Sequence, residues 1–161
     1  MHISITYADL AYGRAAILQP SRALDGSNYA NLIAQAWEAH LAGAQALIVD
    51  LRDLEHISTA GLVGLYAVAR LAQGAPPLDL EAGWPAIRAL AENQPLVRPL
   101  ALVSPHTAVG QTLARPPFSD FLTIHTDLEV ALAALAGRYL SRQHSISQPT
   151  PEQPLVTQLT R

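Results

Sequence analysis

Segments with a strand-like pattern and segments with a helix-like pattern alternate along most of the chain. Apolar residues alternate with polar ones, or form short unbroken runs, over residues 2–7, 14–19, 45–51, 97–103 and 121–125, and such runs predict β-strands. Apolar residues recur every three or four positions over residues 28–41, 60–73, 85–91 and 130–140, which predicts helices. A further helix is expected to begin at Ser104 and Pro105 and to end before Pro116.

Turn and capping residues separate these segments. Gly13 lies between the first two strands, which could form a hairpin, and Asp25-Gly26-Ser27 precedes the first long helix. Thr126 and Glu129 have the spacing of a capping box, with Thr126 as the cap of the last helix. Repeated β-α-β order predicts an α/β fold: a mainly parallel sheet of four to five strands with about four helices packed on it.

The organisation of the chain follows from its length and from one change in composition. A length of 161 residues is enough for one domain, which we place at residues 1–140. Residues 75–95 contain four prolines and interrupt the alternation of strands and helices. Residues 141–161 are rich in Ser, Gln, Thr and Pro and have little to bury, so we expect a mobile, disordered C-terminal tail.

Composition excludes several classes of function. Half of the residues are hydrophobic and 14% are charged, as in a globular domain. The net charge is −3, and all ten basic residues are arginines spread singly, so binding to nucleic acid is not expected. There is no cysteine to form a disulfide or a thiolate metal site. With no run of about 18 apolar residues and no signal peptide, we expect a cytoplasmic protein without membrane insertion.

The motifs of catalysis and cofactor binding are missing from the sequence. The six histidines fall in six different segments, so no zinc site is expected. Asp50 and Asp53 bracket the end of the third strand, and we interpret them as turn residues. No phosphate-binding loop and no G-x-S-x-G motif is found. We therefore expect no enzymatic activity, no cofactor and no metal.

The informative segment is residues 46–65, in which a strand is followed by a short loop and a helix that should begin near Ala60. Ser58 and Thr59 come just before that helix, where a hydroxyl side chain can cap it. The same position can also hold a phosphate, because free amides and the helix dipole favour an anion. Gly61 and Gly64 are small enough to permit close packing of the helix.

Four short stretches of the chain resemble a STAS domain, the fold of the bacterial anti-sigma factor antagonists. Residues 49–51 match the family's strand end, residues 57–62 match its helix start, and residues 24–25 match its Leu-Asp pair. The closing strand and capped helix, residues 121–135, match in order and spacing, so the resemblance covers about residues 2–137.

The chain departs from this family pattern at four places. Thr59 stands where the family has its phosphoacceptor Ser, and it can still accept phosphate. Ser58 stands where the family usually has Asp, and Ala60 stands where it usually has a second Ser. Residues 75–95 form an insertion, because the family's usual link between helix and strand is short.

The resemblance implies a regulatory binding module of signal transduction. Family antagonists bind an anti-sigma factor, which is a Ser/Thr kinase with a histidine-kinase-like ATPase fold, and so release the sigma factor for transcription. Phosphorylation breaks the complex and a metal-dependent phosphatase restores it. The phosphoacceptor aligns with Thr59, with Ser58 as second choice. The implied partner-binding residues are Asp25, Ser27, Ser58, Thr59, Ala60, Gly61, Leu62 and Leu65.

Two other roles stay open for a domain of this kind. One is a STAS subunit that regulates the ATPase of an ABC transporter, and Ser58 in place of Asp favours this role. The other is a ligand sensor or a scaffold in a stress complex, in which the 75–95 insertion with Trp84 shapes a contact. A dimer formed through an exposed helix face also stays open.

Overall fold

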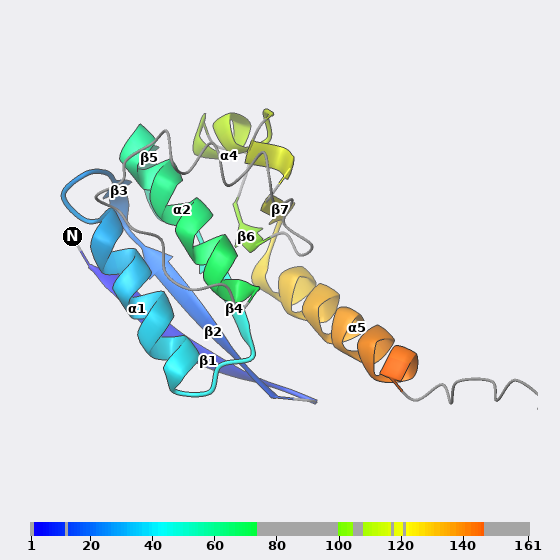
Figure 1. Cartoon of the computed structure of the whole chain (residues 1–161). Coiled ribbons are helices and arrows are strands. Elements are labelled where there is room, and N and C mark those ends of the chain that lie inside the picture. The colour runs from blue at the N-terminus through cyan, green and yellow to red at the C-terminus, as the bar shows by residue number, and fades with distance from the viewer. Residues whose placement is uncertain are drawn as a thin grey trace, which may run out of the picture.

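The computed structural model describes residues 2–11, 13–73, 100–104, 108–116, 118–120 and 122–146. The expected helix at residues 85–91 and the whole 75–95 insertion lie outside the described residues, as do residues 147–161. Figure 1 shows the chain as an open sheet with two helices in front of it.

The main sheet has five strands in the order β1-β2-β4-β6-β7. Strands β1 (Ile3–Leu10) and β2 (Gly13–Pro20) form the predicted antiparallel hairpin. Strands β4 (Ala46–Asp50), β6 (Leu100–Val103) and β7 (Leu122–His125) then add in parallel to β2. This arrangement confirms the predicted α/β fold with a mainly parallel sheet.

A second, two-stranded sheet was not predicted. It pairs β3 (Arg22–Leu24) with β5 (Leu54–Ile57) in parallel. Strands of three and four residues are too short to show a period; β5 falls in the stretch that was expected to be a short loop, and no element was expected over the residues of β3. The short helix α4 (Ala108–Leu113) contacts β5, and the 3-10 turn η2 (Phe118–Asp120) contacts β7.

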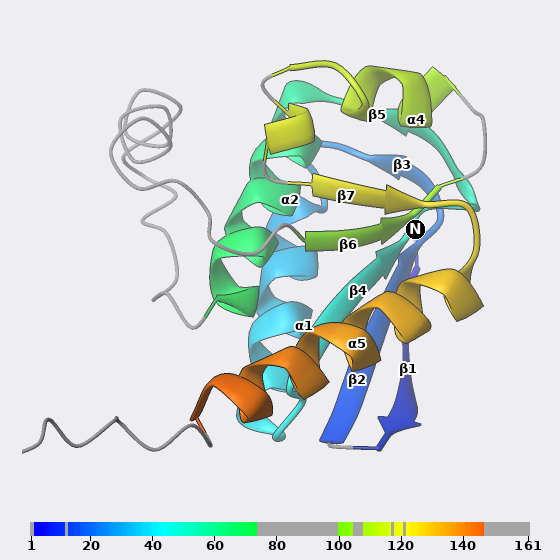
Figure 2. The same ribbon diagram turned by 90° about the vertical axis from the view of Figure 1, so that its right-hand side faces the viewer.

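Helices cover both faces of the main sheet (Figure 2). Helices α1 (Tyr29–Leu41) and α2 (Thr59–Ala72) pack on one face, and α5 (Leu128–Ile146) lies on the other. Side chains alternate between faces along β4: Leu47 and Val49 join the cluster under α1 and α2, and Ile48 joins the cluster under α5. The unbroken apolar run of β4 is therefore explained by burial on both sides.

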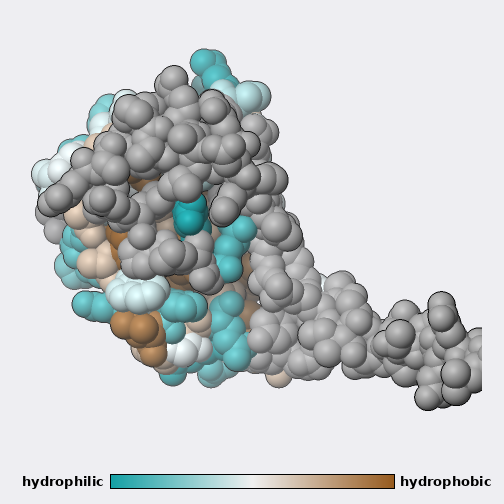
Figure 3. Space-filling view, viewed as in Figure 1, coloured by the Kyte–Doolittle hydropathy of each residue, from teal (hydrophilic) through white to brown (hydrophobic). Residues whose placement is uncertain are grey.

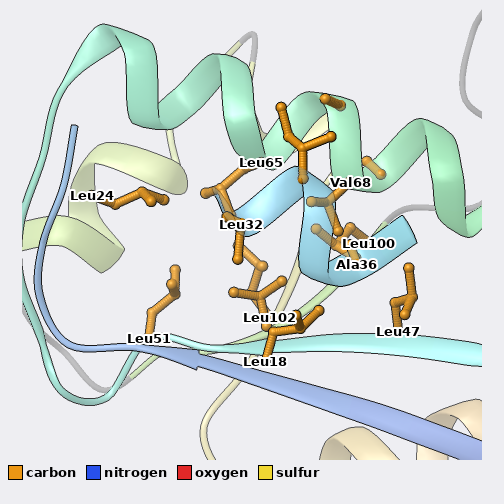
Figure 4. Packing of buried hydrophobic residues seen from close by; sticks show 14 of the residues in the cluster. Leu18, Leu24, Leu32, Ala36, Leu47, Leu51, Leu65, Val68, Leu100 and Leu102 are labelled. Carbon is orange, nitrogen blue, oxygen red and sulfur yellow. The ribbon is translucent and has the colours of Figure 1, made fainter. Parts of the chain in front are cut away.

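The larger cluster packs α2 against the sheet. Leu65 and Val68 of α2 and Leu32 of α1 pack onto Leu18 of β2 and Leu102 of β6, as Figure 4 shows, and all five are fully buried. Burying a side chain of this size contributes roughly 1.5–3 kcal/mol. Helix α2 is therefore anchored to the sheet along its length.

The helix ends correct three details of the sequence analysis. Helix α2 begins at Thr59 rather than near Ala60. Asp127, and not Thr126, caps α5, because its Oδ1 accepts the amide of Val130 at 2.8 Å. Helix α5 continues to Ile146, past the expected end at residue 140. None of the helices in the described ranges combines the length and apolarity that a membrane span requires.

Candidate functional site

The start of α2 assigns different positions to the two candidate hydroxyl residues. Ser58 is extended (φ −93°, ψ 173°), and its Oγ accepts the amide of Gly61 at 3.3 Å. Ser58 is therefore the N-cap. Thr59 is the first helical residue; its side chain is exposed, and its hydroxyl forms no hydrogen bond with the described residues. Of the two hydroxyls, the one of Thr59 is accessible and not engaged in capping.

The loop between β3 and α1 lies beside this helix start. The Asp25 carboxylate accepts the Ser27 amide at 2.8 Å and the Ser27 hydroxyl at 2.6 Å. Asn28, which is only 9% exposed, accepts the Asp25 amide at 2.9 Å and donates to the carbonyl of Ala23 at 3.0 Å. These bonds hold Asp25 and Ser27 in one conformation. Sequence reasoning had placed Asn28 inside the first helix and missed its role in the loop.

Small residues bring the loop and α2 together. The amide of Ser58 donates to the carbonyl of Leu24 at 2.9 Å. A Cβ on Gly61 would overlap that same carbonyl oxygen, and a Cβ on Gly64 would lie 3.1 Å from Cβ of Tyr29 in α1. A Cβ on Gly26 would lie 3.9 Å from that of Ala60. The interpretation of Gly61 and Gly64 as close-packing residues agrees with these approaches.

The structure divides the predicted partner-binding residues into two groups. Ser27 and Thr59 are exposed, and Asp25, Ser58 and Ala60 are half-buried. Gly61 is buried, Leu62 is 9% exposed and Leu65 is fully buried in the core. In this conformation a partner can reach the first group. The second group lies beneath it and holds the helix in place.

The site is acidic. The pKa of Asp25 is lowered mainly by the hydrogen bond from the Ser27 hydroxyl, next by the Ser27 amide, and also by the nearby imidazole of His56. His56 lies on β5, paired with Ala23 of β3. Asp25 is therefore ionised at neutral pH, on the loop beside the N-terminus of α2.

Asp50 and Asp53, the two acidic residues that bracket the end of β4, stabilise the turn that follows this strand. Asp50 is 1% exposed and forms a 2.6 Å ion pair with Nη2 of Arg52, whose pKa is raised by that hydrogen bond and charge. Asp50 also accepts the Arg52 amide at 3.1 Å, and Asp53 accepts from Gln19 at 2.7 Å. Throughout the described part of the chain, no three His, Asp or Glu residues cluster as metal ligands would.

Solved structures share this architecture. No protein-family model matches the sequence, and no curated protein matches it significantly. An anti-sigma factor antagonist from Mycobacterium paratuberculosis is similar in structure, with a TM-score of 0.56 and 18% identity over 83% of this chain and 93% of that one. The chain has the STAS fold of these antagonists.

Two further structures support the STAS fold. The protein TM1081 aligns with a TM-score of 0.56 and 16% identity over 83% of this chain and 89% of its own. The anti-sigma factor antagonist SpoIIAA in its unphosphorylated form aligns with a TM-score of 0.54 and 13% identity, over 83% of this chain and 97% of its own. The resemblance noted in the sequence is therefore confirmed at the level of the fold.

Proposed function

We propose that this chain is a regulatory binding module that docks an anti-sigma kinase through the surface at the start of α2, and that phosphorylation of Thr59 switches the docking. The observation that carries the proposal is the division of roles at the helix start. Ser58 supplies the cap, and the Thr59 hydroxyl is exposed and forms no hydrogen bond with any residue that the structure describes. The STAS fold of the antagonist neighbours supports the same role.

The electrostatics of the site suit a charge switch. A phosphate on Thr59 would add about −1.5 to −2 charges to a surface beside the ionised Asp25. The helix dipole would stabilise that anion by about 0.3–1 kcal/mol, so the phosphorylated form is tolerated. A partner that accepts the neutral hydroxyl would have to desolvate the new charge. Useful switching requires only about 1–3 kcal/mol of coupling.

The first experiment captures partners from a native lysate with four baits: wild type, Thr59→Ala, Thr59→Glu and a control. The control is Thr112→Glu, because Thr112 is an exposed threonine on the separate helix α4. We expect a histidine-kinase-like ATPase on wild type, Thr59→Ala and Thr112→Glu, and its loss on Thr59→Glu. An ABC-transporter ATPase, or the same partners on all four baits, would contradict the proposal.

The second experiment tests the acceptor directly. The captured kinase is incubated with ATP and the wild-type chain, and the modified residue is located by mass spectrometry. We expect phosphate on Thr59 and none on the Thr59→Ala chain. Phosphate on Ser58, the residue whose Oγ caps α2, would contradict the assignment.

A further inference from the structure

Strand β1 forms an open margin of the main sheet. It is eight residues long and within the described residues pairs only with β2, in an unbroken register from Ile3 opposite Pro20 to Leu10 opposite Gly13. Because hydrogen-bonded pairs alternate along an antiparallel ladder, every second residue of β1 directs its N–H and C=O away from β2. The opposite margin, β7, has only four residues.

The β1 margin lacks the usual protection of an edge strand. Edge strands normally carry lysines, prolines or a bulge that prevents pairing with another chain. Strand β1 has no lysine and no proline, its register has no bulge, and its single charged residue is Asp9. Thr6 and Tyr7 in its middle are exposed, Tyr7 by 45%, and no described strand pairs with its outer edge. The guanidinium of Arg14 from β2 lies 4.4 Å from the Tyr7 ring centre, a cation–π contact within the hairpin.

We propose that β1 pairs antiparallel with β1 of a second copy of this chain, so that two sheets join across a two-fold axis. Ile3 and Ile5 belong to the cluster on the α1/α2 face, whereas Ala8 packs on the α5 face. Pairing centred on Ile5 sets Ile3 opposite Tyr7 of the second copy on the first face. On the other face it sets Ser4 opposite Thr6.

This register is self-complementary in both polarity and charge. Apolar side chains meet apolar ones on one face, and hydroxyl side chains meet on the other, and both are favourable cross-strand pairs. The two Asp9 carboxylates lie beyond opposite ends of the paired segment. A register centred on Asp9 would set two carboxylates directly against each other, which is unfavourable.

Backbone pairing suits this surface better than a broad apolar contact. The exposed large apolar side chains among the described residues are Tyr7, Leu41 and Val130, which come from three different elements. On the face drawn in Figure 3 the brown areas are small and separated by hydrophilic residues, and the clearest one lies near the lower end of α1. Figure 2 shows β1 at the outer margin of the main sheet, next to β2. A dimer through β1 uses backbone groups of that strand and none of α2.

The test measures the oligomeric state of the full chain by sedimentation velocity over a dilution series. We expect wild type to reach about twice 17.2 kDa at the higher concentrations. Thr6→Lys should stay monomeric, because it places two ammonium groups at the shared edge. Thr112→Lys adds the same charge on α4 and should still dimerise, and circular dichroism verifies that both variants are folded. A monomeric wild type, or a dimer that survives in Thr6→Lys, overturns the proposal.

The absence of cysteine allows a second test of the register. Side chains that oppose each other across an antiparallel pair are close enough for a disulfide. A mixture of the Ser4→Cys and Thr6→Cys chains should cross-link efficiently under oxidation, and each chain alone should cross-link several-fold less. Equal cross-linking of the mixture and the single variants overturns the β1–β1 register, as does no cross-linking at all.

Discussion

Substituting Gly61 by alanine tests whether close packing at the start of α2 outweighs the higher helix propensity of alanine. A Cβ at this position would overlap the carbonyl oxygen of Leu24 and lie 2.9 Å from Cγ1 of Ile57. Backbone cannot move aside as a flexible side chain can, so the first turn of α2 must shift away from β3. The shift would stretch the bond from the Ser58 amide to Leu24, which is 2.9 Å long in this structure.

The expected cost combines three effects. Overpacking costs about 1–3 kcal/mol, a weakened hydrogen bond costs about 1 kcal/mol, and the better helix propensity of alanine returns at most about 1 kcal/mol. The net loss in the free energy of unfolding is then about 2 kcal/mol, which lowers Tm by about 4–8 °C for a domain of this size.

Two other glycines provide matched controls for urea and thermal unfolding. A Cβ on Gly137 in α5 would meet no atom of the described residues within 4 Å, so Gly137→Ala should raise stability by about 0.5–1 kcal/mol. Gly64→Ala meets Cβ of Tyr29 at 3.1 Å and should fall between the two. A Gly61→Ala chain as stable as wild type, or a Gly137→Ala chain that loses equally, would refute the reasoning.

Three further perturbations test the charged and capping groups by urea unfolding. Arg52→Ala leaves Asp50 buried without its cation. Because Arg52 is 44% exposed and water can enter, we expect the free energy of unfolding to fall by about 2 kcal/mol. The control Arg115→Ala, at an exposed position, should change it by close to zero. The folded-state pKa of Asp25 lies below its unfolded value, so its stabilisation is present above about pH 4 and is lost as pH falls through the folded pKa. The stability difference between wild type and Asp25→Asn should therefore shrink in acid, and a constant difference would contradict this. Ser58→Ala removes the cap and should lower the free energy of unfolding by about 1 kcal/mol, whereas Ser58→Asp, which can still cap, should stay within about 0.5 kcal/mol of wild type. Equal losses in the two variants would exclude a capping role for Ser58.

The main sheet was predictable because its strands carry strong local signals. β4 is a short apolar run buried on both faces, and the β1–β2 hairpin follows from alternation around Gly13. Strands β3 and β5 were missed because three or four residues show no period. That omission matters for the site, since the carbonyl of Leu24 in β3 anchors the start of α2.

Capping residues show a different limit of sequence reasoning. Ser58 and Thr59 are both good caps by residue type, as are Thr126 and Asp127. Which residue caps depends on where the backbone changes from extended to helical, and that is set by tertiary contacts such as the bond from the Ser58 amide to Leu24. The sequence could thus point to the start of α2 as a candidate site but could not separate the cap from the exposed hydroxyl.

This separation also determines how a phosphate on Thr59 would act. Two hydrogen bonds fix the first turn of α2: the Ser58 hydroxyl accepts the Gly61 amide, and the Leu24 carbonyl accepts the Ser58 amide. The close approach of Gly61 to the Leu24 carbonyl also prevents this turn from moving closer to β3. Asn28 holds the neighbouring loop independently of Thr59. A phosphate on Thr59 would therefore change the charge of this surface without moving α2. It follows that Thr59→Glu should weaken partner binding while leaving the amide chemical shifts of the core strands unchanged, and a rearranged core would show that the switch works through conformation instead.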